Sequence, residues 1–191
     1  PQGVQGFIDG MLGLILGEKS PVIMADRVAA VQAPGGCGSL RILAELLTRV
    51  NKDTKVWISD PTWANHIPLM GNAGLSLETY PYFDKATASI RFDAMMDTLR
   101  KVEKGDVVLL HGCCHNPTGA DLTKEQWQQV VEVAKEREFL PFVDLAYQGF
   151  GDGLEEDTYG VRLLCENLPE VIIAASCSKN FGLYRKRVGL A

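Results

Sequence analysis

Residues 106–146 read DVVLLHGCCHNPTGADLTKEQWQQVVEVAKEREFLPFVDLA, and this stretch sets the expected fold. The apolar runs at 106–113 and 139–146 have the uninterrupted character of strands that are covered on both faces of a sheet. Between them, apolar residues recur with the spacing of one helix face, at Trp127, Val130, Val131 and Ala134. Thr123 and Gln126 form a capping-box pattern, which predicts that this helix begins just after GAD. A strand, a helix and a strand in this order predict a parallel pair with a right-handed crossover.

The same alternation extends along the chain. Further strands are predicted at 27–33, 55–59 and 170–176, and helix-face spacing recurs at 43–50 and 92–99. We therefore expect one α/β domain with a mainly parallel sheet flanked by helices. The last residues, RVGLA, begin another strand, and we expect its neighbour in the sheet to have an unpaired apolar edge.

Composition excludes several classes of protein. The chain has 191 residues, is 46% hydrophobic and carries a formal net charge of −5, with no long basic run that would predict a nucleic-acid partner. Its apolar runs are shorter than the ~20 residues that span a bilayer, and no secretory signal pattern is visible. The odd number of cysteines, five, argues against a disulfide framework and favours the reducing cytoplasm.

Cys113 and Cys114, flanked by His111 and His115, raise the question of a metal site. Adjacent residues of a strand point to opposite faces, so neighbouring cysteines there do not converge on one ion. We therefore predict no metal site and interpret these residues as buried thiols.

In a mainly parallel sheet, functional groups gather at the carboxyl ends of the strands. After residue 33 comes PGGCGS and then a helix, an arrangement in which backbone N–H groups can bind a phosphate, although such turns are also common connectors. Neither the G-x-G-x-x-G spacing nor a Walker motif is present. Trp63 follows the next strand, either as a core residue or as a flat face for a planar ligand.

The remaining strand ends also allow two interpretations each. Asn116 is either a turn residue or a hydrogen-bonding ligand, and Asp144 needs a partner, either within the protein or on a cationic ring nitrogen. Lys179 is either a solvated loop lysine or an amine beside a phosphate that Ser176, Ser178 and Arg187 would bind. A phosphate cradle, a stacking ring, a buried acid and a lysine are together what pyridoxal phosphate requires.

Three blocks, HGCCHNPTGADLTKEQW (111–127), DLAYQGFGDGLEED (144–157) and SCSKNFGLYRKRVG (176–189), resemble the aspartate/aromatic-amino-acid aminotransferases. The similarity runs from about ILGEKS (15–20) to the last residue. This resemblance implies fold type I, in which a large domain with a three-layer, mainly parallel sheet carries pyridoxal 5'-phosphate, and it implies a homodimer with shared active sites.

The resemblance also implies a role for individual residues. Lys179 would be the Schiff-base lysine and proton shuttle, and Asp144, with His66 behind it, would pair with the pyridinium nitrogen. Trp63 would stack on the ring and, together with Asn116, contact the substrate. The other cofactor contacts implied are Asn116 and Tyr147 at the ring oxygen, and Gly36, Cys37, Ser176 and Arg187 at the phosphate.

Two departures from the family pattern matter. Cys37 stands where the family usually has threonine, so a hydroxyl donor to the phosphate is replaced by a weaker thiol. The chain also contains no counterpart of the family's small domain, whose arginine grips the substrate carboxylate. We therefore expect residues 1–191 to form a partial cofactor-binding large domain that is poorly active alone.

The function that the resemblance implies is transamination of aspartate or aromatic amino acids with a 2-oxo acid such as 2-oxoglutarate. Two alternatives remain open at this point. One is another reaction on the same cofactor, decarboxylation or elimination, and the other is a scaffold without turnover.

Overall fold

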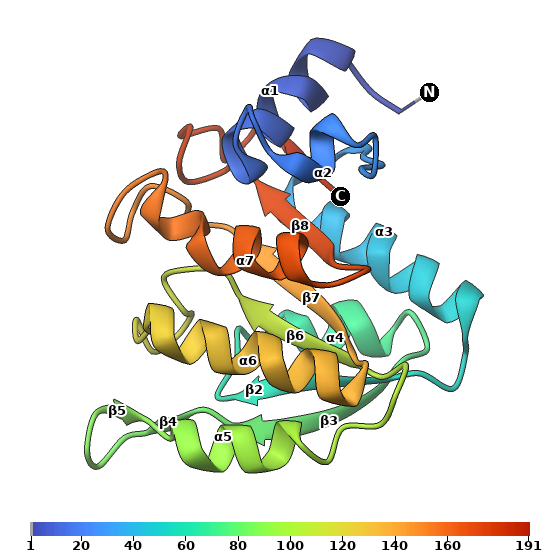
Figure 1. The fold of residues 1–191 in the computed structure, drawn as a ribbon. Coiled ribbons are helices and arrows are strands. Elements are labelled where there is room, and N and C mark those ends of the chain that lie inside the picture. The colour runs from blue at the N-terminus through green and yellow to red at the C-terminus, as the bar shows by residue number, and fades with distance from the viewer. Residues whose placement is uncertain (1) are drawn as a thin grey trace.

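The computed structural model describes residues 2–191 and shows a three-layer α/β arrangement (Figure 1). A seven-stranded sheet forms the middle layer, and all of its strands run in one direction except β9. In spatial order the strands are β1 (Gln32–Ala33), β9 (Gly189–Leu190), β8 (Ile172–Ser176), β7 (Leu140–Leu145), β6 (Val107–His111), β2 (Lys55–Asp60) and β3 (Ser76–Pro81). The predicted mainly parallel sheet is confirmed.

Helices cover both faces of the sheet, with α5, α6 and α7 in front of it and α3 and α4 behind it in Figure 1. The helices are α1 (Gln5–Leu16), α2 (Pro21–Met24), α3 (Gly35–Val50), α4 (His66–Gly71), α5 (Phe92–Leu99), α6 (Lys124–Arg137) and α7 (Tyr159–Asn167), with one 3₁₀ turn, η1 (Glu156–Thr158). A small hairpin, β4 (Phe83–Asp84) with β5 (Ser89–Ile90), precedes α5.

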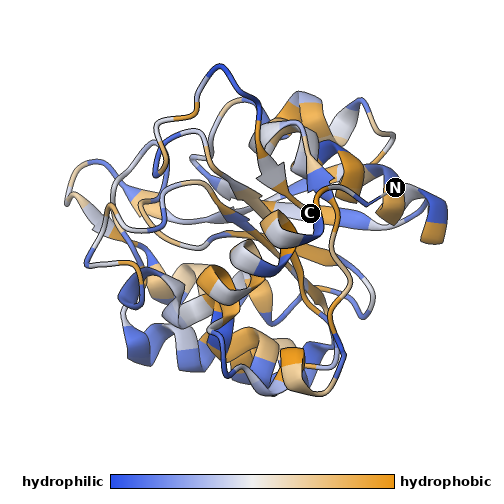
Figure 2. Ribbon diagram, turned by 90° about the horizontal axis from the view of Figure 1, so that it is seen from above, coloured by the Kyte–Doolittle hydropathy of each residue, from blue (hydrophilic) through white to orange (hydrophobic). Residues whose placement is uncertain are grey.

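The continuous apolar runs of the strands follow from the two cores that the sheet separates. In β6, Val108 and Leu110 belong to the core under α5, α6 and α7, whereas Val107 and Leu109 belong to the core under α3 and α4. Successive side chains of a strand point to opposite faces, so a strand between two cores needs apolar residues at every position. In Figure 2, orange segments run through the strands in the middle of the molecule.

The capping box of α6 is present. The Thr123 hydroxyl accepts a hydrogen bond from the Gln126 backbone N–H, and the Gln126 side chain accepts one from the Thr123 backbone N–H. Both bonds satisfy donors that a helix start leaves free, so the local sequence sets where α6 begins.

Two strand predictions were wrong. Of residues 27–33, only Gln32–Ala33 form a strand. The final strand does not leave its neighbour with a fully unpaired edge, because β9 lies between β1 and β8 and pairs antiparallel with both. Both errors concern β1 and β9, which pair although they lie at opposite ends of the chain, and local sequence patterns do not reveal such pairing. Two backbone hydrogen bonds between Val31 and Ala191 extend the contact.

Across residues 2–191, no helix has both the length and the apolar character needed to cross a membrane.

Candidate active site

The carboxyl ends of β2, β6, β7 and β8 and the start of α3 meet around a cavity of about 210 Å³. This is the edge of a parallel sheet where ligand sites form. All the residues that the resemblance assigned to the cofactor line this cavity: Gly36, Cys37, Trp63, Asn116, Asp144, Tyr147, Ser176, Lys179 and Arg187. The other lining residues are Leu40, His111, Cys113, Ala146, Ser178 and Tyr184. The tenth assigned residue, His66, lies behind Asp144.

One end of the cavity gathers groups that favour a negative charge. The helix α3 begins at Gly35, and its first backbone N–H groups and its dipole favour negative charge there. Gly36 lies against Ser176, so close that a Cβ on Gly36 would be 3.0 Å from the Ser176 Cβ. Arg187 closes this end, and its guanidinium donates hydrogen bonds to Ser178 Oγ (3.3 Å) and to the Tyr184 carbonyl (2.8 Å). A phosphate at this end would meet the backbone N–H groups of α3 together with the side-chain donors of Ser176 and Arg187.

Lys179 lies in the turn that follows β8, on the cavity wall. Its Nζ is 4.5 Å from the centroid of the Tyr147 ring, which is a cation–π distance. Its amine is half-buried and faces the same cavity as Ser176 and Arg187. The lysine is therefore an amine beside an anion cradle, and not a solvated surface lysine.

Asp144 lies in β7 and is buried, with only 8% of its surface exposed. Its Oδ2 is 2.8 Å from Nε2 of His66, a histidine that is fully buried at the start of α4. The His66 Nδ1 is 2.8 Å from the Thr62 hydroxyl, which in turn is 3.2 Å from Nε2 of His111. These contacts form one hydrogen-bonded chain from the end of β6 to Asp144.

The direction of this chain follows from its last member, the backbone N–H of Asn116, which donates to Nδ1 of His111 (3.3 Å). A backbone N–H can only donate, so Nδ1 accepts and the neutral His111 carries its proton on Nε2. His111 then donates to Thr62, the Thr62 hydroxyl donates to His66 Nδ1, and His66 Nε2–H donates to Asp144. Asp144 thus receives a donor in a fixed orientation, which an ionised carboxylate requires.

The three histidines of the chain form one cluster at the cavity, in which His66 meets His111 edge-on and His111 stacks on His115. His115 stacks on His111 at 3.9 Å and on Tyr82 at 4.0 Å between ring centroids, and it is 2.9 Å from the Ser59 hydroxyl. Burial, together with the nearby His115 and His66, holds the pKa of His111 well below its usual range. Burial lowers the pKa of His115 to about 4. Both rings are therefore neutral at pH 7, in agreement with the direction of the hydrogen-bonded chain.

Sequence reasoning assigned no cofactor role to His111 and left Thr62 and His115 out of the site. The signal that could have found them is the position of polar residues at the ends of buried strands, where His111 ends β6 and Thr62 follows β2. The order of the strands brings Thr62 and His111 together, because β2 and β6 are neighbours in the sheet.

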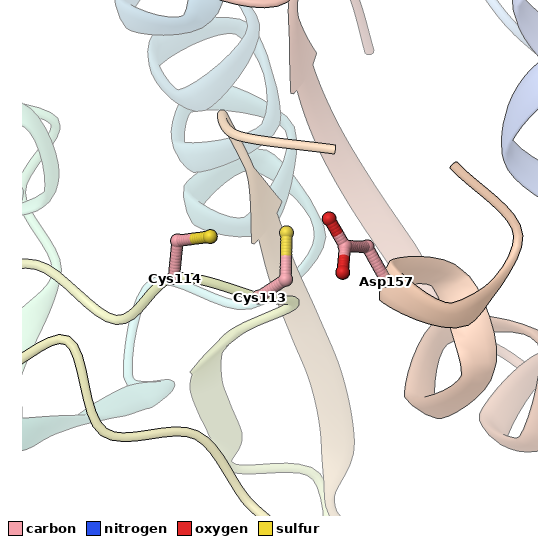
Figure 3. A group of neighbouring side chains, drawn as sticks. All are labelled: Cys113, Cys114 and Asp157. Carbon is pink, nitrogen blue, oxygen red and sulfur yellow. The ribbon is translucent and has the colours of Figure 1, made fainter. Parts of the chain in front are cut away.

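The expectation that Cys113 and Cys114 point to opposite faces was wrong. It applies to a strand, but β6 ends at His111 and both cysteines lie in the turn after it. Cys114 has φ = 48°, in the left-handed region, which turns its side chain to the same side as that of Cys113. Figure 3 shows the two sulfur atoms and the Asp157 carboxylate facing one another. Burial, followed by the neighbouring Cys114 and carboxylates, raises the pKa of Cys113 far above its usual range.

The fold has three layers with a mainly parallel sheet, and a lysine and a buried acid line the cavity at the carboxyl edge of that sheet. These features are those of the fold-type-I transferases. The family model for aminotransferase class I and II matches residues 8–191, and the chain belongs to this family.

Individual relatives agree with this family. The chain is 50% identical over 187 residues to the aromatic-amino-acid aminotransferase of Paracoccus denitrificans, covering 98% of this chain and 47% of the relative. It is 46% identical over 176 residues to the aspartate aminotransferase of Escherichia coli K12, covering 92% of this chain and 44% of the relative. The chain therefore spans about half the length of the curated relatives it matches.

Solved structures agree as well. The crystal structure of an aromatic-amino-acid aminotransferase from Burkholderia pseudomallei, covalently bound to pyridoxal phosphate, has a TM-score of 0.97 and 46% identity, with 99% of this chain and 47% of that chain covered. The cytoplasmic aspartate aminotransferase of Saccharomyces cerevisiae has a TM-score of 0.94 at 38% identity, with 99% and 47% covered.

Proposed function

We propose that this chain carries the cofactor site of a pyridoxal-phosphate-dependent aminotransferase. Its substrates would be aspartate, aromatic amino acids or both, with a 2-oxo acid such as 2-oxoglutarate as the amino-group acceptor. The observation that carries the proposal is that Lys179, the anion cradle and the Asp144–His66 pair line or adjoin one cavity. Relatives named as aromatic-amino-acid, tyrosine and aspartate aminotransferases support the reaction and both substrate classes.

The residues present fit pyridoxal 5'-phosphate. The N-terminal turn of α3, Ser176 and Arg187 supply neutral and charged donors for a phosphate, with Gly36 leaving room for its close approach. Cys37 would contribute a weaker donor at the same place. At the other end, Asp144 offers the single buried carboxylate that lines the cavity among the described residues.

When bound, this cofactor supplies an electron sink for the bond that breaks at the substrate's α-carbon. In the proposal, Lys179 Nζ would hold the cofactor covalently and would be the group that carries the α-proton. Asp144 would hold a proton on the ring nitrogen, and Asn116 and Tyr147 would donate to the ring oxygen. Trp63 would cover the face of the ring, and Trp63 and Asn116 would contact the substrate.

Charge and shape support these roles. The Lys179 amine lies 4.5 Å from the centroid of the Tyr147 ring and lines the same cavity as Ser178 and Arg187, where a substrate amine and a phosphate would both be within its surroundings. His66, Thr62 and His111 would fix Asp144 by the directed hydrogen bonds that run from His111 to its carboxylate. These three residues act through Asp144, so they position it and do not contact the reacting atoms.

We also propose that residues 1–191 belong to the cofactor-binding large domain, that the whole protein is a homodimer, and that it functions in the cytoplasm. The match of one family model across residues 8–191 supports a single domain. Five free cysteines support a reducing compartment.

A half-reaction tests the proposed function. The whole protein, loaded with pyridoxal phosphate, is mixed with aspartate or tyrosine without an acceptor, and absorbance, 2-oxo acid and CO₂ are measured. Transamination predicts one 2-oxo acid per site, conversion of the cofactor to its amine form and no CO₂. Release of CO₂, or of ammonia with the cofactor unchanged, would favour decarboxylation or elimination. No cofactor absorbance on loading would favour the scaffold.

A further inference from the structure

A second group of chemically active side chains lies next to the cofactor cavity. The Sγ atoms of Cys113 and Cys114 and a carboxylate oxygen of Asp157 all lie within 4.8 Å of one another. Cys113 also lines the cavity, whereas Cys114 is half-exposed and Asp157 is buried. Figure 3 shows the Cys113 sulfur between the other two groups, with all three pointing into the same space.

The two thiols are held in place by their backbone. Both oxygens of Asp121 accept hydrogen bonds from the turn, one from the Cys114 N–H (2.6 Å) and one from the His115 N–H (2.8 Å). Together with the left-handed conformation of Cys114, these bonds fix the turn that brings the sulfur atoms to one side. These bonds act on the backbone of the turn, and through it they limit where the Cys114 sulfur can lie.

The carboxylate of Asp157 is fixed in the same way, and one of its oxygens retains capacity for a further bond. Its Oδ2 accepts from the Gly149 and Gly151 N–H groups at 2.7 and 2.9 Å. Its Oδ1 accepts from Asp152 N–H at 2.8 Å, but only at 3.4 Å from Gly153 N–H. The 3.4 Å contact is longer than an ordinary N–H···O bond, so Oδ1 has a lone pair that a cation can use.

Spacing and charge both favour a cation. Tetrahedral coordination with metal–sulfur bonds of about 2.3 Å separates two sulfur ligands by about 3.8 Å, so closing the present spacing needs shifts of at most about 1 Å. The charged groups that act on the two thiols are the carboxylates of Asp121, Asp152 and Asp157. The surroundings are therefore negative, and the ligands are soft sulfur with one oxygen.

We propose that Cys113, Cys114 and Asp157 bind a thiophilic divalent cation, with Zn²⁺ as the natural representative. Two thiolates and one carboxylate leave a fourth position open to solvent, and this ligand set suits Zn²⁺ and Cd²⁺ and disfavours Mg²⁺ and Ca²⁺, which take oxygen ligands. The site adjoins the cofactor cavity through Cys113 and does not use Lys179, Asp144 or Arg187. It is independent of the proposed transamination.

Cadmium titration tests this site, because Cd²⁺ bound to thiolates gives a charge-transfer absorbance in the ultraviolet. The reduced protein is titrated with Cd²⁺ and the affinity and stoichiometry are read from that absorbance. We expect one Cd²⁺ per chain with two thiolates, displaced by Zn²⁺ and not by Mg²⁺. Cys114→Ser should halve the absorbance and weaken binding by roughly 100-fold or more, since even residues outside the ligand shell typically change affinity 10–100-fold.

Cys165→Ser is the matched control, because Cys165 is also a free, partly buried thiol but lies on α7 away from this group. It should leave the titration unchanged. Cys113→Ser should behave as Cys114→Ser does, and circular dichroism of each variant establishes that it is folded. If Cys113→Ser does not fold, the half-exposed Cys114 alone decides the outcome. A titration that Cys114→Ser leaves unchanged, or that Cys165→Ser abolishes, would overturn the proposal.

Discussion

The cavity has two ends on the same edge of the sheet, and the side chains of the two ends differ in chemistry. The cationic end comprises the start of α3, Ser176, Ser178, Lys179 and Arg187, and its cations are half-buried or exposed. The imidazole end comprises His66, His111, His115, Thr62 and Asp144, which are joined by hydrogen bonds and by ring contacts.

The difference shows how one site can both attract a ligand and orient it. Donors at the cationic end line an open cavity, where an anion from solution can accept hydrogen bonds from them. Groups at the imidazole end already form hydrogen bonds with one another, so they orient the Asp144 carboxylate rather than attract an anion. Substitutions at the two ends should therefore change different measurements.

The largest effect should follow Lys179→Ala, which removes the amine of the cationic end. After loading with pyridoxal phosphate, borohydride reduction and peptide mapping, the unaltered protein should carry its label on Lys179 and the variant none. Lys186→Ala is the control, because Lys186 is exposed in the same turn and does not line the cavity. A label on Lys186 or Lys19 would show that the lysine is wrongly assigned.

The next largest effect should follow Asp144→Asn at the imidazole end. An amide cannot hold a ring nitrogen protonated, and losing a buried charge partner amounts to about 3–5 kcal/mol, which is roughly two to four orders of magnitude in the rate of proton abstraction. Single-turnover absorbance measures that rate, and a separate titration should show that the cofactor still binds. Asp106→Asn, a buried aspartate that bonds Trp57 far from the cavity, should leave the rate unchanged. An ordinary rate for Asp144→Asn would contradict the proposed role.

A smaller effect should follow Thr62→Val, which keeps the shape but removes the hydroxyl between His66 and His111. One buried polar group left without a partner costs about 1–3 kcal/mol, and this hydroxyl bonds two ring nitrogens, so the free energy of unfolding should fall by at least about that amount in a denaturant titration. Thr98→Val is the control, since its hydroxyl bonds a carbonyl of its own helix. Phosphate affinity should not change in either variant. If it falls in Thr62→Val, the two ends are not independent.

The smallest effect should follow Cys37→Thr at the cationic end. A hydroxyl in place of the thiol should tighten cofactor binding by about 0.5–1.5 kcal/mol, provided that it reaches the phosphate. The measurement is a cofactor titration, with Cys37→Ala as a control that adds no donor and should give no gain. Equal affinity for the threonine variant would indicate that backbone N–H groups of α3 hold the phosphate without this side chain.

Local patterns in the sequence predicted much of the fold. The helix expected at 92–99 is α5 (Phe92–Leu99), and the capping box placed the start of α6 correctly. The edge strand β3 (Ser76–Pro81) was missed, because its exposed positions carry Ser76, Glu78 and Thr79 and interrupt the apolar run. The helices α1 and α7 were also not predicted from the sequence.

The sequence by itself determined the layered α/β class and the chemistry at each strand end. Both are local properties, since apolar periodicity follows from the geometry of one helix or strand and a residue's functional group is fixed by its identity. Lys179, Asp144 and the glycine turn could therefore be identified from the order of the residues alone.

Only the tertiary structure decided how these groups act on one another. The hydrogen bonds from His111 through Thr62 and His66 to Asp144 join residues 49 and 78 positions apart, and their direction depends on a backbone N–H at Asn116. The side on which Cys114 places its sulfur depends on a left-handed turn that Asp121 fixes from seven residues away. Hydrogen-bond direction and turn dihedrals depend on which groups the fold brings within bonding distance, and periodicity in the sequence does not encode them.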